Sequence, residues 1–266
     1  MARSAILNVM VQAAMKAGRS LSRDFGEVQN LQVSLKGPGD YVSQADRKAE
    51  EIIFAELSKA RPGYSFLMEE RGAVHGDDDQ HRWIVDPLDG TTNFLHGIPL
   101  FSVSIALERQ GQIVAGVIYN PGMDELYTAE RGGGAFMNDR RLRVAARSKL
   151  TDAVIGCGVP HLGRGHHGNF LLELRNVMGE VAGIRRMGSA ALDLAYVAAG
   201  RMDGFWEANL SAWDIAAGLL MVREAGGFVS DMGGGQDMLD DGTVVAGNEA
   251  IHRTLLKTLK KPLPPR

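Results

Sequence analysis

The chain has 266 residues, of which 45% are hydrophobic and 23% are charged, and its formal net charge is −3. This ordinary globular composition excludes a disordered chain, a collagen and a coiled coil. The slightly acidic balance provides no overall positive field for nucleic acid. The single cysteine, Cys157, excludes an internal disulfide and a multi-cysteine zinc site. We therefore expect a cytoplasmic globular protein without a membrane span.

Helical periodicity opens the chain. Apolar residues recur three and four positions apart between Ile6 and Leu21, which predicts an amphipathic helix. A second helix is predicted to begin at 43–46, where the sequence resembles a capping box, and to end at Pro62-Gly63. Strand-like runs follow at 64–67, 83–85, 103–107, 113–119 and 135–137, with a hairpin expected at Gln110-Gly111.

In the second half of the chain, strand-like and helical segments alternate. Strands are predicted at 154–156, 205–206, 228–229 and 244–245, and helices at 168–178, 190–199, 213–225 and 249–259. This order predicts layered helices and sheets, an α/β (α+β) fold. We expect two lobes, 1–148 and 149–266, packed as one unit.

An acidic motif follows the run at 83–85. Residues 86–94 have the sequence Asp-Pro-Leu-Asp-Gly-Thr-Thr-Asn-Phe. Two carboxylates three residues apart on a turn stiffened by Pro87 can bind hard cations, and the Leu88 carbonyl can add a third oxygen. Oxygen-only ligation suits Mg²⁺ rather than zinc. The alternative is a solvated surface turn, with Asp86 and Asp89 binding nothing.

Two further acidic features extend the motif. Glu69-Glu70 follows the run at 64–67 and can bring a third carboxylate to the same strand ends. Asp214 opens a helix with an apolar face, where the alternative function is a helix cap. Together these residues predict a carboxylate cluster.

These motifs resemble the inositol monophosphatase family. Residues 86–94 resemble its first signature, and Trp213-Asp214-Ile-Ala-Ala-Gly, followed by Glu224-Ala-Gly-Gly, resembles its second. Lys36, Asp46, Glu69-Glu70 and the loop at 188–191 match further positions. The resemblance therefore covers nearly the whole chain.

The resemblance implies an αβαβα sandwich that is usually dimeric and Li⁺-sensitive. It implies a Mg²⁺ site made of Glu69, Asp86, the Leu88 carbonyl, Asp89 and Asp214. Glu69 and Thr91 would orient the attacking water, with Asp46 joined to Thr91 in a hydrogen-bond relay. The implied substrate contacts are Lys36, Asp89, Gly90, Thr91, Arg185, Ser189, Ala190, Glu207 and Asp214.

The function implied is Mg²⁺-dependent hydrolysis of a phosphorylated polyol, with myo-inositol 1-phosphate as the leading substrate. One alternative is a sister phosphatase for histidinol phosphate, fructose bisphosphate or a 3′-phosphonucleotide, although Thr92-Asn93 favours the inositol type. Another is a regulatory protein that binds RNA polymerase or a ribonucleoprotein.

Histidine and cysteine side chains that could bind or react lie outside the acidic motif. The histidines 161, 166 and 167 can bind a metal or clamp substrate, but a solvated loop is favoured because no carboxylate lies at ligand spacing. Cys157 is expected to be a packed thiol.

Overall fold

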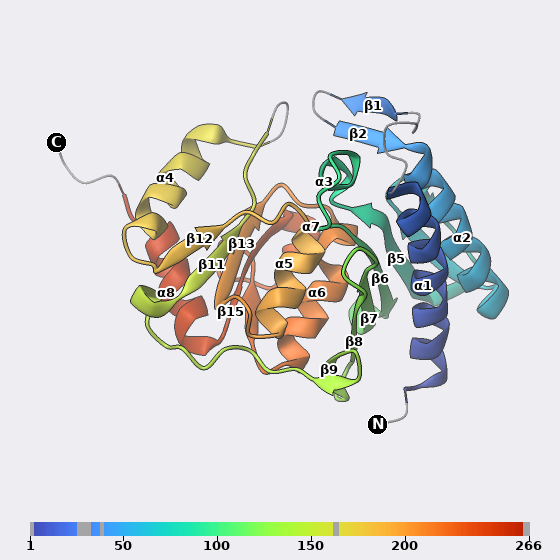
Figure 1. Cartoon of the computed structure of the whole chain (residues 1–266). Helices are drawn as coiled ribbons and strands as arrows, with labels where there is room; N and C mark the ends of the chain where they lie inside the picture. Colours follow the sequence, from blue (N-terminus) through green and yellow to red (C-terminus); the bar gives the residue numbers. More distant parts are fainter. Residues whose placement is uncertain (1–2, 26–32, 38–39, 162–164, 263–266) are drawn as a thin grey trace.

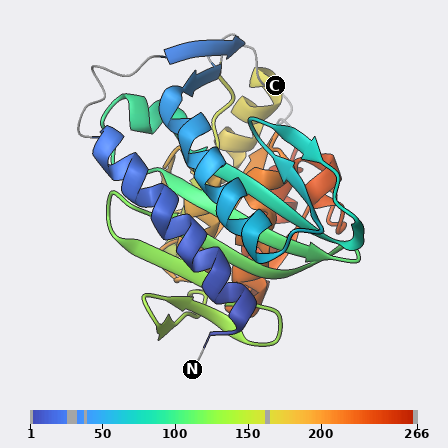
Figure 2. The ribbon, with the colours of Figure 1, turned by 90° about the vertical axis from the view of Figure 1, so that its right-hand side faces the viewer.

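The computed structural model of the chain describes residues 3–25, 33–37, 40–161 and 165–262. Its elements form five layers, helix, sheet, helix, sheet and helix, which follow one another across Figure 1. The first layer contains α1 (Ala5–Phe25) and α2 (Gln44–Ala60). α1 buries the predicted apolar face, from Leu7 to Leu21, against the first sheet. Figure 2 shows both helices lying across that sheet.

The second layer is an eight-stranded sheet in the order β10-β9-β8-β7-β6-β5-β3-β4. Only β3 and β5 are parallel neighbours in it. The predicted hairpin joins β6 to β7, and its two central residues, Gln110 and Gly111, have φ angles of 51° and 75°, as a tight hairpin turn requires. The strands are β3 (Tyr64–Met68), β4 (Gly72–Val74), β5 (Asp78–Asp89), β6 (Ser102–Arg109), β7 (Gln112–Asn120), β8 (Glu125–Glu130), β9 (Gly134–Met137) and β10 (Arg140–Arg141).

The middle layer consists of α5 (Ala190–Ala198) and α6 (Ala212–Glu224). Every residue of α5 is buried, and α6 is buried from Ile215 to Val222, because each helix has a sheet on either side. The close approach of α6 to α5 depends on Gly218, where a Cβ would lie 2.6 Å from the Leu194 side chain. A helix that is apolar around its whole circumference fits this central position.

The fourth layer is a five-stranded sheet in the order β12-β11-β13-β15-β14, and α4 (His167–Met178) and α8 (Glu249–Leu259) cover its outer face. Short elements complete the fold: β1 (Val33–Gly37), β2 (Asp40–Ser43), α3 (Thr91–Leu95), η2 (Leu150–Asp152) and α7 (Met238–Asp241). The strands of this sheet are β11 (Val154–Cys157), β12 (Gly183–Arg185), β13 (Gly204–Ala208), β14 (Phe228–Ser230) and β15 (Thr243–Gly247).

The layered α/β prediction is confirmed, and the long helices lie where periodicity placed them. The short strands β4, β8, β10 and β12 were not predicted, because two to six residues carry too little periodic signal. Among the described residues, no helix combines the length and hydropathy that crossing a bilayer requires. The division into lobes at residue 148 stays a prediction.

Candidate active site

A β-bulge at the end of β5 sets the direction of two carboxylates. On the β6 side of the ladder, Asp86 pairs with Ser104 and Asp89 pairs with Ser102, so β5 contains one extra residue. Side chains alternate along a strand, and an odd spacing would send the two aspartates to opposite faces. The extra residue removes this mismatch. Asp86 and Asp89 consequently line one cavity.

The backbone after Asp89 needs glycine. Gly90 has a φ of 90°, and a Cβ on it would lie 2.9 Å from the Leu100 carbonyl and 3.2 Å from the Gly188 carbonyl. α3 begins at the next residue. The Asn93 amide then donates hydrogen bonds to the carbonyls of Leu100 (2.7 Å) and Met187 (2.8 Å). The acidic turn is thereby fastened to the loop before α5.

Glu50 of α2 holds the Glu69-Glu70 turn, which follows β3. Its Oε2 accepts the backbone N–H of Glu70 at 2.8 Å and that of Arg71 at 3.4 Å. The Glu69 N–H donates to the Val85 carbonyl of the neighbouring β5 at 3.2 Å. Glu69 therefore lies beside the end of β5 and lines the same cavity.

Asp89 is held by the start of α5. Its Oδ2 accepts hydrogen bonds from the Ser189 hydroxyl (2.6 Å) and the Ala191 N–H (2.7 Å). Ser189 is also the N-cap of α5. A carboxylate at a helix N-terminus is stabilised by the unpaired N–H groups and the helix dipole. This arrangement joins the acidic motif of the first half to the 188–191 loop of the second half.

Asp214 is both a helix cap and part of the cavity. Its Oδ2 accepts the Ser211 N–H at 2.7 Å in the capping box that opens α6. The same side chain lines the cavity and contributes to the electrostatic repulsion at Asp86. The two expectations for Asp214, a cap and a cluster carboxylate, are therefore compatible.

Thr91 connects the cavity to a buried carboxylate. Its Oγ1 lies 3.0 Å from Oδ1 of Asp46 and 3.0 Å from the Leu88 carbonyl, and Asp46 is fully buried in the first turn of α2. Both neighbours are acceptors, so the single hydroxyl proton is directed at one of them. The lone pairs of Oγ1 can then accept a hydrogen from an incoming molecule such as water.

The cavity, of about 140 Å³, concentrates negative charge. Its only arginine or lysine among the described residues is Arg186. Burial, together with repulsion from Glu69, Asp89 and Asp214, raises the pKa of Asp86 well above its usual value. Burial also raises the pKa of Asp89 to about 6, although hydrogen bonds from Ser189 and Ala191 act in the opposite direction. The lining carboxylates are Glu69, Asp86, Asp89, Glu207 and Asp214.

This donor set fits a hard divalent cation. All the donors are oxygens, and the Leu88 residue of the bulge lines the cavity beside the carboxylates. Within the part of the chain that the structure describes, no three of the acidic, histidine or cysteine side chains already form a ligand cluster. A hydrogen bond joins the side chains of Glu69 and Asp86. Ionised carboxylates can only accept, so one of the two carboxyl groups must be protonated to donate this hydrogen bond. A cation would replace this proton and draw the oxygens together.

The remaining expected contacts divide into three groups. Gly90, Ser189, Ala190 and Glu207 line the cavity with the acidic residues. Arg185 does not line it, and its Nη1 donates to the Ile184 carbonyl, whereas the adjacent Arg186 does line the cavity. The polyol contact expected of Arg185 stays a prediction. Adjacent side chains on extended backbone point in opposite directions, so Arg185 and Arg186 extend to opposite sides of the chain. Lys36 is in β1, and its side chain lies outside the described residues.

Sequence reasoning missed three contributors. Arg186 lies over Gly188, where a Cβ would be 2.1 Å from its Nη1. Glu50 is an acid on the buried face of an amphipathic helix, a pattern that could have signalled its role. His161 is only partly exposed and lines the cavity. His166 and His167 are exposed, but they are the N-cap and the first residue of α4 and do not form the expected loop.

Cys157 is buried and free, as expected of a packed thiol. Burial raises the pKa of its thiol to about 12, and nearby Asp193 and Glu207 act in the same direction. A thiol in this environment stays protonated and is a weak nucleophile. It takes no part in the chemistry of the cavity.

Comparison with known proteins agrees with the fold and the motifs. The model of the inositol monophosphatase family matches residues 2–262. A protein of Mesorhizobium japonicum named inositol-1-monophosphatase is 88% identical over 266 residues, which are 100% of both chains. A protein of Pseudomonas aeruginosa named Nus factor SuhB is 46% identical, over 98% of this chain and 97% of its own. The crystal structure of the extragenic suppressor protein suhB from Bartonella henselae has a TM-score of 0.96 and 72% identity, and it covers 98% of this chain and 100% of its own.

Proposed function

Because the chain belongs to the inositol monophosphatase family, we propose that it hydrolyses myo-inositol 1-phosphate and similar polyol phosphates with Mg²⁺ as cofactor. One observation carries the proposal: carboxylates from four separate segments of the chain line one cavity, with the Thr91–Asp46 hydrogen bond beside them. A dianionic phosphomonoester cannot approach such a cavity unless cations offset the carboxylates. Glu69, Asp86, the Leu88 carbonyl, Asp89 and Asp214 would hold these cations.

Bound Mg²⁺ would screen the phosphate charge, lower the pKa of water and stabilise the leaving alkoxide. The protein would position the reactants. Oγ1 of Thr91, whose proton is donated to Asp46 or to the Leu88 carbonyl, would accept one hydrogen of the water, and Glu69 would accept the other. The N–H groups of Gly90 and Thr91 at the start of α3 hold phosphate oxygens.

The water attacks phosphorus in line with the scissile bond. The new P–O bond forms as the bond to the alcohol oxygen breaks, and that oxygen takes up a proton in exchange for the one that the attacking water gives up. Arg186, Ser189, Ala190 and Glu207 line the cavity and would contact the alcohol. No covalent enzyme intermediate is needed.

A panel of phosphomonoesters tests the proposal. Phosphate release would be measured with Mg²⁺, with and without Li⁺, from myo-inositol 1-phosphate, histidinol phosphate, fructose 1,6-bisphosphate and a 3′-phosphonucleotide. We expect the highest kcat/KM with the inositol ester, and inhibition by Li⁺. A higher kcat/KM for another member would assign the chain to a sister activity instead.

We also propose that the chain forms a homodimer and is cytoplasmic. Light scattering tests the first proposal and cell fractionation tests the second.

The relative named Nus factor SuhB favours a second role, the binding of transcription machinery. Because the carboxylates that line the cavity are all present, we expect catalysis to accompany any such role. A pull-down of RNA polymerase with the unaltered chain and with Asp89→Asn separates the two. Capture by both proteins, with phosphatase activity lost in the variant, would support an independent interaction surface. Capture by neither would contradict this second role.

A further inference from the structure

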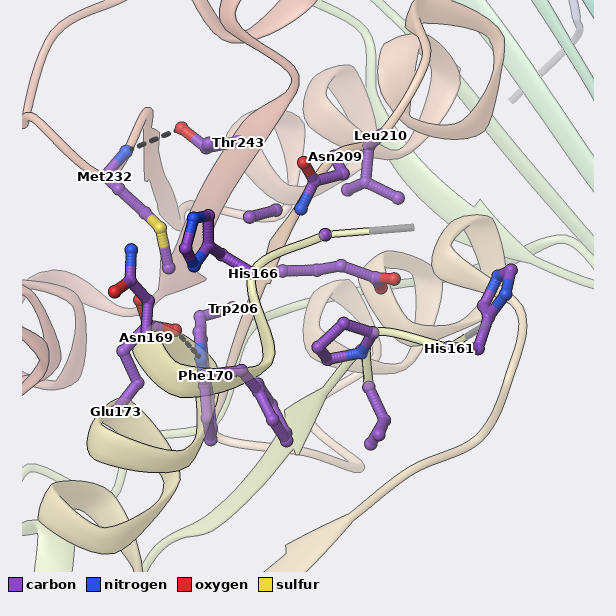
Figure 3. A pocket seen from close by; sticks show the side chains of 16 residues that line it. His161, His166, Asn169, Phe170, Glu173, Trp206, Asn209, Leu210, Met232 and Thr243 are labelled. Atoms are coloured by element: carbon purple, nitrogen blue, oxygen red, sulfur yellow. Dashed lines mark hydrogen bonds between the residues drawn. The ribbon is translucent and has the colours of Figure 1, made fainter. Parts of the chain in front are cut away.

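A second cavity, of about 300 Å³, adjoins the candidate active site. The two share a boundary made of Gly158, Val159, His161, Glu207 and Leu210. The accessory cavity, as we call it, extends from this boundary to the first turns of α4, which Figure 3 shows from close by. Its volume is within the range of small-molecule sites in proteins. A ligand in the active site thus has room to extend into it.

The absence of a side chain at Gly158 leaves room for Glu207 at the boundary between the two cavities. A Cβ there would lie 1.8 Å from Cδ of Glu207, so any other residue would occupy the place of the Glu207 carboxylate. Glu207 is already expected to contact the leaving alcohol, and it lines both cavities. A group bonded to that alcohol would therefore meet Glu207 first and then the accessory cavity.

The described lining of the accessory cavity disfavours a second phosphate. Its described lining residues include two carboxylates, Glu173 and Glu207, and neither lysine nor arginine. An additional anion would be repelled by both carboxylates. A group that donates hydrogen bonds suits them, because an ionised carboxylate can only accept.

One side of the accessory cavity is aromatic. The rings of Phe170 and Trp206 lie nearly parallel, 6.5 Å apart at an angle of 23°, and the Trp206 indole donates to Oε2 of Glu173 at 3.2 Å. Figure 3 shows this hydrogen bond, with Phe170 beside Trp206. An aromatic surface next to carboxylates and amides suits a ring with an apolar face and a polar edge.

Polar side chains surround that aromatic side. Asn169, Asn209 and His166 lie around the centre of the cavity in Figure 3. At the shared boundary, Nδ1 of His161 is buried and has no hydrogen-bond partner among the described residues. A buried polar atom without a partner costs stability unless a ligand or water satisfies it. This atom is a second sign of a ligand-binding surface.

We propose that the accessory cavity binds a second, uncharged ring bearing hydroxyl groups, so that the chain accepts glycosylated polyol phosphates. Hydroxyl donors would meet Glu173, Glu207 and the amide oxygens of Asn169 and Asn209. The C–H face of the ring would lie on Phe170. This inference rests on the proposed phosphatase function for its kinetic test, but the binding of the ring can be tested separately.

Two commercial esters provide the kinetic test. Glucose 6-phosphate and trehalose 6-phosphate share the phosphorylated hexose and differ by one neutral ring. We expect kcat/KM for trehalose 6-phosphate to exceed that for glucose 6-phosphate by about tenfold, the scale of discrimination that a binding pocket supplies. Equal values in the unaltered chain would overturn the proposal.

A matched pair of variants locates the effect. Asn169 lines the accessory cavity and is exposed, so Asn169→Trp fills the cavity without disturbing the core. Leu171, two residues along α4, is 61% exposed and does not line it, so Leu171→Trp is the control. The preference for trehalose 6-phosphate should disappear in the first variant and persist in the second. Loss of the preference in both or in neither would contradict the assignment.

Two further results decide the ligand class and the dependence on catalysis. If adenosine 5′-phosphate gains the same Asn169-dependent preference over ribose 5-phosphate and trehalose 6-phosphate has none, the ring is heteroaromatic and the proposed class is wrong. If no ester is hydrolysed, myo-inositol 1-phosphate included, the proposed function fails. Saturation-transfer NMR of free trehalose then tests the cavity alone. A signal lost only in Asn169→Trp supports the proposal, and no signal with the unaltered chain overturns it.

Discussion

The hydroxyl of Thr91 is the smallest feature on which the proposed chemistry depends. It joins Asp46, fully buried in the helical layer, to a cavity lined by carboxylates. The neighbouring Thr92 also lines the cavity and is exposed. Of these two adjacent threonines, Thr91 has a hydrogen bond to the buried carboxylate of Asp46. This hydrogen bond makes the role of the hydroxyl testable.

Thr91→Val removes the hydroxyl and keeps the shape of the side chain. We expect kcat to fall by about two decades with a small change in KM, because positioning and proton transfer act in the transition state. Steady-state kinetics with myo-inositol 1-phosphate would measure both constants. Thr92→Val is the matched control and should stay within a few-fold of the unaltered chain. A change confined to KM in Thr91→Val would contradict the water-orienting role.

At the scale of elements, Asn93 joins the end of the acidic motif to the loop before α5. Its amide nitrogen is shared by the Leu100 and Met187 carbonyls, and the residue is 6% exposed. An acceptor in place of this donor would face two carbonyl oxygens, which are also acceptors. We expect Asn93→Asp to lower the free energy of unfolding by about 2–3 kcal/mol.

Thermal or denaturant unfolding would measure this change. Asn8→Asp is the control, because Asn8 makes an exposed contact of 3.4 Å to the Arg3 carbonyl. The control should change stability by less than about 0.5 kcal/mol. An equal effect of the two substitutions would refute the clamping role of Asn93.

Periodicity and motif spacing predicted the long elements but not the local geometry of the site. The helices from Ala5 and Gln44 carry several turns of apolar periodicity, and the structure contains both. The bulge between Asp86 and Asp89 was not predicted, because it depends on pairing with β6. Arg186 was not singled out beside Arg185 for the same reason. The strand direction that distinguishes them is set by β11, the parallel neighbour of β12.

At the scale of the whole molecule, one ion pair connects the first sheet to the central helices. Glu125 of β8 accepts hydrogen bonds from both Nη atoms of Arg201, at 2.7 and 2.8 Å, and from the Tyr127 hydroxyl at 2.7 Å. Arg201 follows α5 and also lies over the Tyr196 ring. Burial alone would raise the pKa of Glu125, but these hydrogen bonds outweigh it and hold the pKa below its usual value of 4.5.

The sign of this shift predicts a pH dependence. Because the folded-state pKa is lowered, the pair stabilises the fold above about pH 4.5, and this contribution is lost as the pH falls through the folded-state pKa. Glu125→Gln should therefore lower the free energy of unfolding by about 1–2 kcal/mol at pH 7, a shift of about 3–6 °C in Tm. The deficit should shrink toward pH 3.

Melting curves across pH 3–7 would measure the deficit. Glu56→Gln breaks the exposed pair with Lys16 and is the control, with an expected change of less than about 0.5 kcal/mol. A deficit of the same size at pH 3 and pH 7 would show that charge is not the cause.

The central claim is that the carboxylate cavity hydrolyses a phosphomonoester with a divalent cation. The most direct measurement is phosphate release from myo-inositol 1-phosphate after exhaustive chelation, with Mg²⁺ then titrated back, for the unaltered chain and Asp89→Asn. We expect chelation to abolish activity and Mg²⁺ to restore it, with kcat/KM in the variant lower by at least about two to three decades, or about 3–4 kcal/mol. Full activity after chelation, or near-normal turnover of Asp89→Asn at saturating Mg²⁺, would contradict the account.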